Sequence, residues 1–207
     1  MKLSRPDPNT QEYWNNNYKK GERGGWWNAS KPLGAIKTFM SKEIEQTPKG
    51  KLIEIGGGSG LGPQRILADY PQLTVYNADI SSYAIELGKE KYPDITHLVW
   101  DANKKADFLK LDNQFDILIT QETLEHLKQP KQSLQYMMKL LKVGGYAFIG
   151  TPLNEGDTGG AEHIHTFSYE ETMRWLFVYT SEVTVCHFTP IGNNLHLGVK
   201  FQKTKEA

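Results

Sequence analysis

A glycine-rich loop that follows a short apolar run provides the first chemistry in this chain. Glu54 lies in the run Lys51–Ile55, and Gly56, Gly58 and Gly60 alternate after it. Because glycine has no Cβ atom, the loop can take positive φ angles and bring its N–H groups against a ligand. The run is typical of a buried parallel strand, and the helix expected after the loop would point its N-terminus at the same spot. The stretch indicates a nucleotide-like ligand, with a tight strand-to-helix turn as the alternative.

The spacing of the glycines argues against a dinucleotide. A Gly-x-Gly-x-x-Gly fingerprint counted from Gly56 puts Leu61 at the third glycine position, and counted from Gly58 it puts Pro63 there. The pattern Glu-x-Gly-x-Gly-x-Gly in this stretch instead resembles the first motif of the class I S-adenosylmethionine (SAM) dependent methyltransferases. The resemblance implies that the loop cradles the methionine end of SAM, whose ammonium suits a nearby acid. The residues implied for this role are Glu54, Gly56, Gly57, Gly58 and Gly60.

A second acidic side chain ends the next expected strand. Asp79 lies nineteen residues beyond Gly60, close to the roughly twenty at which α/β nucleotide folds place a carboxylate on ribose hydroxyls. A carboxylate can accept both hydrogen bonds of a cis-diol, so Asp79, with Ile80 beside it, is predicted to bind the ribose. The alternative for Asp79 is the N-cap of the helix that follows.

Further positions come from the resemblance alone. In similar methyltransferases an acid just after the third strand takes the adenine amino group, which implies Asp101, followed by Ala102. A surface turn is the alternative for Asp101. The loop after the fourth strand lies beside the reacting methyl group, which implies Gln121. Open α/β sheets bind ligands at the carboxyl ends of their strands, so these side chains are expected to converge with Glu54 and Asp79.

Three histidines could act as a general base, because an imidazole titrates near neutrality. They are His126, in Glu122-x-x-Glu125-His126, and His163 and His165, in Glu162-His163-Ile164-His165. Methyl transfer from a sulfonium depends mostly on positioning and needs a base only when the acceptor must lose a proton. The alternative for His126 is to hold a loop by hydrogen bonds.

The same stretches could hold a divalent metal. Glu122, Glu125 and His126 would share one helical face at i, i+3 and i+4, and His165 would complete an oxygen and nitrogen site for Mg²⁺ or Mn²⁺. This set resembles the metal site of the small-RNA 3′-terminal 2′-O-methyltransferases. Quinone-biosynthesis O-methyltransferases look similar around the same acid–histidine helix. Solvated or structural side chains are the alternative.

Aromatic residues near the N-terminus predict a lid. Trp14 and Tyr18 lie four residues apart on one helical face, and Gly21–Asn28 places paired tryptophans among glycines. Such a segment could cover a small ligand, with Trp14 against the cofactor, whereas simple packing onto the sheet is the alternative. We therefore divide the chain into an N-terminal arm and helical lid, 1–48, and a SAM-binding core, 49–207.

Strands that alternate with helices predict a doubly wound α/β sheet in a single domain. The expected strands are Lys51–Ile55, Leu73–Ile80, Thr96–Trp100, Phe115–Thr120, Tyr146–Gly150, Val183–Phe188 and Leu195–Phe201. The expected helices are Leu33–Ile44, Gln64–Tyr70, Ser82–Tyr92, Ser133–Leu141 and Tyr169–Phe177. Two late strands without a helix between them fit an antiparallel seventh strand. The resemblance implies a Rossmann-like, seven-stranded sheet in the order 3-2-1-4-5-7-6.

Composition narrows the classes of function. Lys plus Arg and Asp plus Glu number 24 each, so no net charge draws the chain to nucleic acid or to an anionic membrane. The one cysteine, Cys186, cannot form an internal disulfide, and no signal peptide or membrane span is visible. We therefore expect a cytoplasmic protein that is a monomer or a homodimer.

These features predict a SAM-dependent methyltransferase that acts on an oxygen or nitrogen of a small molecule and releases S-adenosylhomocysteine (SAH). A metal-dependent RNA ribose 2′-O-methyltransferase and a SAM-binding regulatory protein without turnover are the alternatives. The neutral charge and the lack of a separate basic domain argue against RNA. The acid–histidine residues argue against a purely regulatory role.

Overall fold

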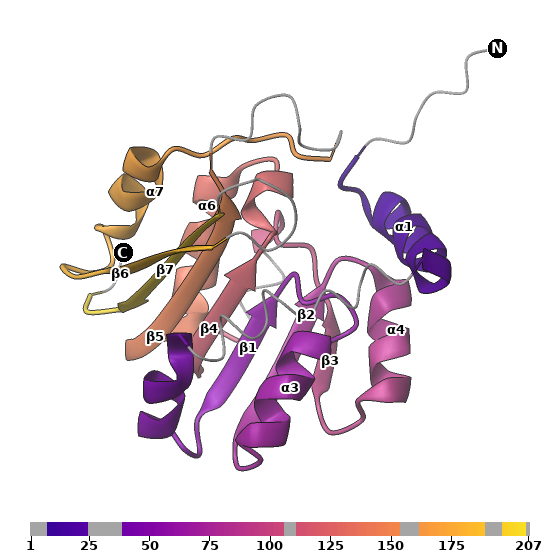
Figure 1. The fold of residues 1–207 in the computed structure, drawn as a ribbon, viewed down its shortest axis with the longest axis horizontal. Helices are drawn as coiled ribbons and strands as arrows, with labels where there is room; N and C mark the ends of the chain where they lie inside the picture. Colours follow the sequence, from indigo (N-terminus) through magenta and orange to yellow (C-terminus); the bar gives the residue numbers. More distant parts are fainter. Residues whose placement is uncertain (1–7, 25–38, 106–110, 154–161, 189–195, 206–207) are drawn as a thin grey trace.

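The computed structural model describes residues 8–24, 39–105, 111–153, 162–188 and 196–205, whose elements are shown in Figure 1. The helices are α1 (Gln11–Gly24), an unlabelled helix over residues 39–46, α3 (Leu61–Asp69), α4 (Ser82–Lys91), the 3₁₀ turn η2 (Leu124–His126), α6 (Pro130–Leu140) and α7 (Tyr169–Leu176). The strands are β1 (Lys51–Ile55), β2 (Thr74–Asp79), β3 (Thr96–Val99), β4 (Phe115–Gln121), β5 (Leu141–Pro152), β6 (Thr184–Phe188) and β7 (His196–Gln202). The paired tryptophans of the predicted lid, Trp26 and Trp27, lie outside the described residues.

All seven strands belong to one sheet, in the order β3-β2-β1-β4-β5-β7-β6. β7 pairs antiparallel with β5 and β6, and the other neighbouring strands pair in parallel. The predicted α/β sheet with an antiparallel seventh strand is therefore confirmed. Because β1 to β5 run in parallel, their carboxyl ends meet at one edge, which is the upper edge in Figure 1. α1 lies at that end of the molecule.

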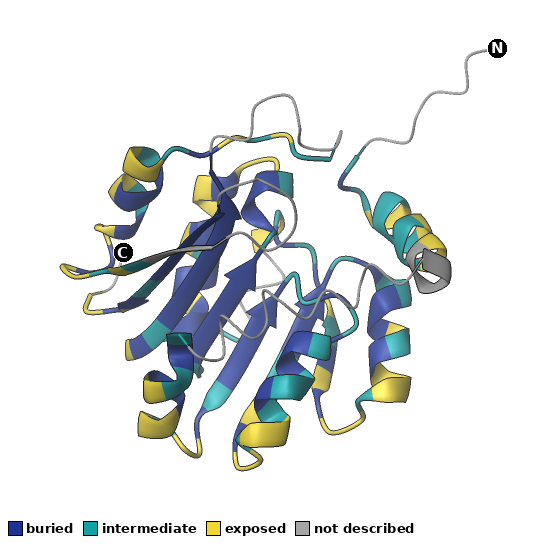
Figure 2. Ribbon diagram, in the orientation of Figure 1, coloured by how far each residue is buried: buried dark blue, intermediate teal, exposed yellow. Residues whose placement is uncertain are grey.

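Helices on both faces bury the sheet, which explains why its strands are continuous apolar runs. Neighbouring residues of a strand point to opposite faces, so Leu52 and Ile53 of β1 belong to different cores. Leu52 shares a buried cluster with Met40, from the helix before β1, whereas Ile53 shares one with Met137 of α6. Figure 2 shows the strands buried and the outer sides of the helices exposed.

Hydroxyl side chains cap several helices. Thr10 Oγ1 accepts from the Tyr13 N–H at 3.2 Å at the start of α1, and Ser81 Oγ accepts from the Ala84 N–H at 3.1 Å at the start of α4. Each such cap is worth about 1 kcal/mol. Ser81, not Asp79, therefore caps α4. None of the described helices is long and apolar enough to cross a membrane.

Two local expectations are wrong. The stretch from Glu122 to His126 is not one helix, because the Glu122 N–H still bonds to the Gly150 carbonyl of β5 at 3.1 Å and only a 3₁₀ turn follows. The second is the start of the fifth strand, which was expected at Tyr146. β5 begins at Leu141, at once where α6 ends, so Gly144 lies inside the strand with φ 88°.

Candidate active site

The glycine loop after β1 folds back against the end of β2. Gly56, Gly58 and Gly60 have φ angles of 80°, 58° and 89°, a region that side chains rarely tolerate. The Gly58 N–H donates to Asp79 Oδ2 at 2.9 Å, and the Asn77 side-chain amide donates to the Gly58 carbonyl at 2.8 Å. These bonds hold the loop in a fixed shape at the carboxyl edge of the sheet.

Two buried carboxylates, Glu54 and Asp79, lie beside this loop. Burial raises the pKa of Glu54 to about 7, and the neighbouring charge of Asp79 adds to the rise. Burial raises the pKa of Asp79 to about 6, although the N–H groups of Ser81 and Gly58 stabilise its ionised form. Two acids that resist being ionised together make a site that favours a cation.

Tyr18 of α1 lies against the same loop. A Cβ atom added at Gly58 would collide with the Tyr18 hydroxyl. Burial, together with the charges of Asp79 and Glu54, raises the pKa of Tyr18 well above its usual range, so the phenol keeps its proton. The sequence predicted Tyr18 only as part of the lid, whereas the structure places its hydroxyl against the glycine loop.

The ends of β4 and β5 bury polar atoms that have no hydrogen-bond partner in the described ranges. They are Thr120 Oγ1, Gln121 Oε1 and Thr151 Oγ1. An unpaired buried polar group costs about 1–3 kcal/mol, so such atoms indicate a place where a ligand or a water completes the bonding. Gln121, predicted to lie near the transferred methyl group, is one of them. The glycine loop, the two acids and these atoms together fit a ligand with a cationic, polar end.

A cavity of about 500 Å³ adjoins the ends of β2 and β3. Ile80 and Asp101, both predicted to bind the nucleoside end of the cofactor, line it, and Ala102 is buried next to Asp101. Asp101 Oδ1 accepts from the Asn103 N–H at 3.0 Å, and Asp101 Oδ2 lies 3.3 Å from Lys104 Nζ. The volume is enough for one heterocycle.

Glu125, His126 and His163 form a compact cluster after β4. Glu125 is fully buried, and one possible ligand atom from each residue lies within 4.8 Å of the others. His126 Nδ1 lies 3.0 Å from the Glu162 carbonyl, from which we assign the proton to Nδ1 and the lone pair to Nε2. His126 Nε2 lies 3.8 Å from Glu125 Oε1. The cluster can accept a proton or bind a metal ion.

The structure brings two of the four predicted metal ligands, Glu125 and His126, into this cluster. Glu122 instead has φ 49° and directs its carboxylate to His196 of β7, with Oε1 2.7 Å from Nδ1. A side chain in this left-handed region is strained, and such strain is common at functional sites. The sequence carried no signal for His196, which lies 74 residues from Glu122.

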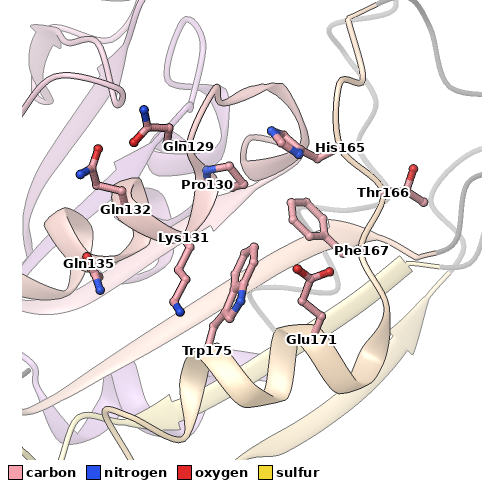
Figure 3. Close-up of a pocket in the computed structure, with 10 residues that line it drawn as sticks. All are labelled: Gln129, Pro130, Lys131, Gln132, Gln135, His165, Thr166, Phe167, Glu171 and Trp175. Atoms are coloured by element: carbon pink, nitrogen blue, oxygen red, sulfur yellow. The ribbon is translucent and has the colours of Figure 1, made fainter.

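His165 lies on a groove of about 380 Å³ between the starts of α6 and α7 (Figure 3). Its ring stacks on Phe167 with centroids 6.1 Å apart, and Phe167 meets Trp175 edge-on at 5.5 Å. The backbone N–H groups of Ile164 and His165 both donate to the Glu125 carbonyl. The loop that carries His163 and His165 is therefore fixed to η2. His163 belongs to the cluster with Glu125 and His126, and His165 lies in the groove.

α1 links the two sides of the site. On one side Gln11 Nε2 donates to the Ile80 carbonyl at 3.0 Å, and Asn15 Oδ1 accepts from the Ser81 hydroxyl at 2.8 Å. On the other side the Tyr13 hydroxyl donates to Glu162 Oε2 at 3.1 Å. The Trp14 ring meets the His126 ring edge-on at 5.0 Å, so Trp14 covers the histidine cluster.

Comparisons with known sequences identify relatives of this chain. Residues 53–147 match the methyltransferase domain family. The ubiquinone biosynthesis O-methyltransferase of Coxiella burnetii (strain Dugway 5J108-111) is 30% identical over 173 residues, which cover 77% of this chain and 73% of that protein. The Nitrosomonas europaea protein of the same name is 25% identical, and the match covers 61% of this chain and 57% of that protein. The chain thus spans between about half and three quarters of the length of these relatives.

Comparison with solved structures agrees with the topology. The Burkholderia thailandensis 1,6-didemethyltoxoflavin-N1-methyltransferase, solved with bound SAH, superposes with a TM-score of 0.69 at 15% identity, covering 98% of this chain and 94% of that one. The CurJ carbon methyltransferase superposes with a TM-score of 0.67 at 16% identity, covering 84% of this chain and 54% of that one. At such identities the similarity shows the fold alone.

Proposed function

We propose that this chain, which belongs to the class I SAM-dependent methyltransferases, transfers the methyl group of SAM to a hydroxyl oxygen of a small molecule. The observation that supports this most is the position of the Glu125, His126 and His163 cluster at the carboxyl edge of the sheet that also carries the glycine loop. A hydroxyl must lose its proton on methylation, and the cluster can take it. The O-methyltransferase names of the sequence relatives favour oxygen over nitrogen.

The cofactor fits along the edge of the sheet. Glu54 would pair with the methionine ammonium at the glycine loop, and Asp79 would accept hydrogen bonds from the ribose hydroxyls. The adenine would enter the cavity lined by Ile80 and Asp101. Gln121, whose Oε1 is buried without a partner in the described part of the chain, would contact the cofactor near its methyl group. This order follows the order in which the strand ends lie across the sheet.

His126 is the proposed proton acceptor. SAM supplies a methyl carbon that its sulfonium already activates, so the chain contributes positioning and proton removal. The Glu162 carbonyl holds the His126 ring through Nδ1, and Nε2 lies on the side of Glu125, 3.8 Å from Oε1. Trp14 packs on the same ring and would exclude water once the acceptor is bound.

A divalent metal at the same cluster is the second candidate. Two imidazoles and one carboxylate, from His126, His163 and Glu125, suit Mn²⁺, Fe²⁺ or Zn²⁺ better than Mg²⁺, which prefers oxygen. The contact between His126 Nδ1 and a backbone carbonyl is the kind that orients metal-bound histidines. A bound metal would lower the pKa of a coordinated hydroxyl and would replace the base.

The acceptor that fits these features is a phenol or catechol. The relatives named for ubiquinone biosynthesis support an aromatic hydroxyl, and the aromatic side chains of Trp14 and His126 provide a surface for a flat ring. Residues 1–48 would act as the lid over this acceptor. The cytoplasmic location and the monomeric or homodimeric state stay predictions.

The test measures SAH release from SAM with a panel of catechols, phenols and primary amines, using wild type, His126→Ala and Lys139→Ala. Lys139 is exposed on α6 and serves as the control. We expect turnover with hydroxyl acceptors and a loss of about a hundredfold or more in His126→Ala. Full activity of His126→Ala, or turnover with amines alone, would contradict the proposal. Loss of activity in chelator with recovery in Mn²⁺ would assign the metal route, whereas unchanged activity would assign the base.

A further inference from the structure

We propose that Asn9, in the segment before α1, accepts a hydrogen bond from the adenine amino group of bound SAM and thereby helps to select an adenine cofactor. The inference rests on the cofactor placement proposed above, with the ribose at Asp79 and the adenine near Asp101. It assigns a cofactor contact to the segment before α1, for which the sequence predicted no contact.

The Asn9 side chain is held in one orientation. Asn9 is only 6% exposed, and its backbone has φ 68°, a left-handed conformation that asparagine adopts more readily than most residues. Its Nδ2 donates to the Glu162 carbonyl at 2.8 Å. A flipped amide would set two oxygen atoms against each other, so the bond to Glu162 identifies which end is the oxygen.

The remaining Asn9 oxygen requires a donor. Asn9 Oδ1 is buried and has no hydrogen-bond partner among the residues that the structure describes. A buried acceptor without a hydrogen-bond donor is unfavourable, and in native proteins a ligand or a water usually donates to such an atom. The bond that Nδ2 makes to the Glu162 carbonyl docks the segment, and Oδ1 takes no part in that bond.

The location of Asn9 points to the adenine. Asn9 lines the cavity of about 500 Å³ together with Ile80 and Asp101, which are the residues proposed to contact the nucleoside. Asp101 already accepts a hydrogen bond from Asn103 and lies against Lys104. The adenine amino group has two N–H donors, so it can bond to Asp101 and to Asn9 at once. The ribose hydroxyls, by contrast, would be bound by Asp79, which lies on the side of the glycine loop.

The same contact would tie cofactor binding to the acceptor side of the site. The Glu162 carbonyl that receives the Asn9 Nδ2 bond also receives the bond from His126 Nδ1. One backbone oxygen therefore lies between the proposed adenine contact and the proposed base. An adenine that fixes Asn9 would also steady the carbonyl that orients His126.

The test compares two ligands by calorimetric titration. The first is SAH, and the second is its 6-deamino analogue, in which hydrogen replaces the adenine amino group. The proteins are wild type, Asn9→Gly, which keeps the left-handed backbone, and Gln11→Ala. Gln11 docks the same segment through the Ile80 carbonyl and serves as the matched control. Circular dichroism confirms that each variant is folded.

We expect Asn9→Gly to weaken the binding of SAH about five- to tenfold more than the binding of the deamino analogue, because only SAH loses the hydrogen bond to Oδ1, whereas both ligands share the loss of the Nδ2 bond that docks the segment. Gln11→Ala should lower the affinity for both ligands by the same factor. An equal loss of affinity for both ligands in Asn9→Gly, or no loss for either, would overturn the inference, because Asn9 would then only dock the arm. The cofactor placement fails separately if Asp79→Ala binds SAH as wild type does.

Discussion

Replacing Glu54 by glutamine should stabilise the free protein while weakening its binding of SAM. Glu54 is buried beside Asp79, and its pKa rises from 4.5 to about 7 on folding. At about 1.4 kcal/mol per pH unit, a carboxyl with this pKa lowers the free energy of unfolding by about 3 kcal/mol once it is ionised. Glutamine has nearly the same shape and carries no charge, so the variant avoids this loss.

The pH dependence of stability follows from the direction in which the pKa of Glu54 changes on folding. A carboxyl whose pKa is higher in the folded state binds more protons there, so stability falls as the pH rises through the window from 4.5 to about 7. Below that window the Glu54 carboxyl is protonated in both the folded and the unfolded state, so it does not lower the free energy of unfolding. Glu54→Gln should therefore match wild type near pH 4.5 and exceed it by about 3 kcal/mol at pH 8.

The assay is urea unfolding of wild type, Glu54→Gln and the exposed control Glu90→Gln at several pH values without cofactor. Glu90→Gln should follow wild type at every pH. The affinity of Glu54→Gln for SAM at pH 8 should fall by about ten- to a hundredfold, because the methionine ammonium would lose the charged partner that we propose for it. A difference in stability between Glu54→Gln and wild type that does not change with pH would refute the reasoning, as would a variant that binds SAM normally.

Three further outcomes follow from the structure. Gly58→Ala should weaken SAH binding at least about tenfold by calorimetry, because its Cβ atom meets Tyr18, whereas Gly144→Ala, also at positive φ but in open space, should bind normally. Lys203→Met removes two bonds from a buried ammonium to backbone carbonyls, and its free energy of unfolding should fall by about 2–3 kcal/mol. The exposed Lys205→Met should stay within about 0.5 kcal/mol of wild type. If the cluster after β4 binds metal, Mn²⁺ should raise the melting temperature, and His163→Ala should abolish the rise.

The sheet could be predicted because its signals are local. The apolar run before Gly56 and the alternating glycines identify β1 and its loop without reference to the rest of the chain. The spacing to Asp79 identifies the next strand end in the same way. The family resemblance then supplied the strand order, which local periodicity does not determine.

The acid–histidine stretch shows where local reasoning stops. A helical face through Glu122 and Glu125 was expected from spacing alone, yet the pairing of β4 with β5 continues through Glu122 and delays the turn. The partner of Glu122, His196, comes from a distant strand. Asn9 likewise has no sequence signal, since its burial depends on the docking of α1 against the histidine loop.

The most direct test of the central claim is a calorimetric titration of the purified protein with SAM, SAH and NAD, repeated with Asp79→Ala. The structure places Asp79 against the Gly58 N–H, where the ribose would lie. We predict that wild type binds SAM and SAH at micromolar concentration and does not bind NAD, and that Asp79→Ala loses both sulfur nucleotides. Failure of wild type to bind either one would contradict the account and would reassign the glycine loop to another ligand.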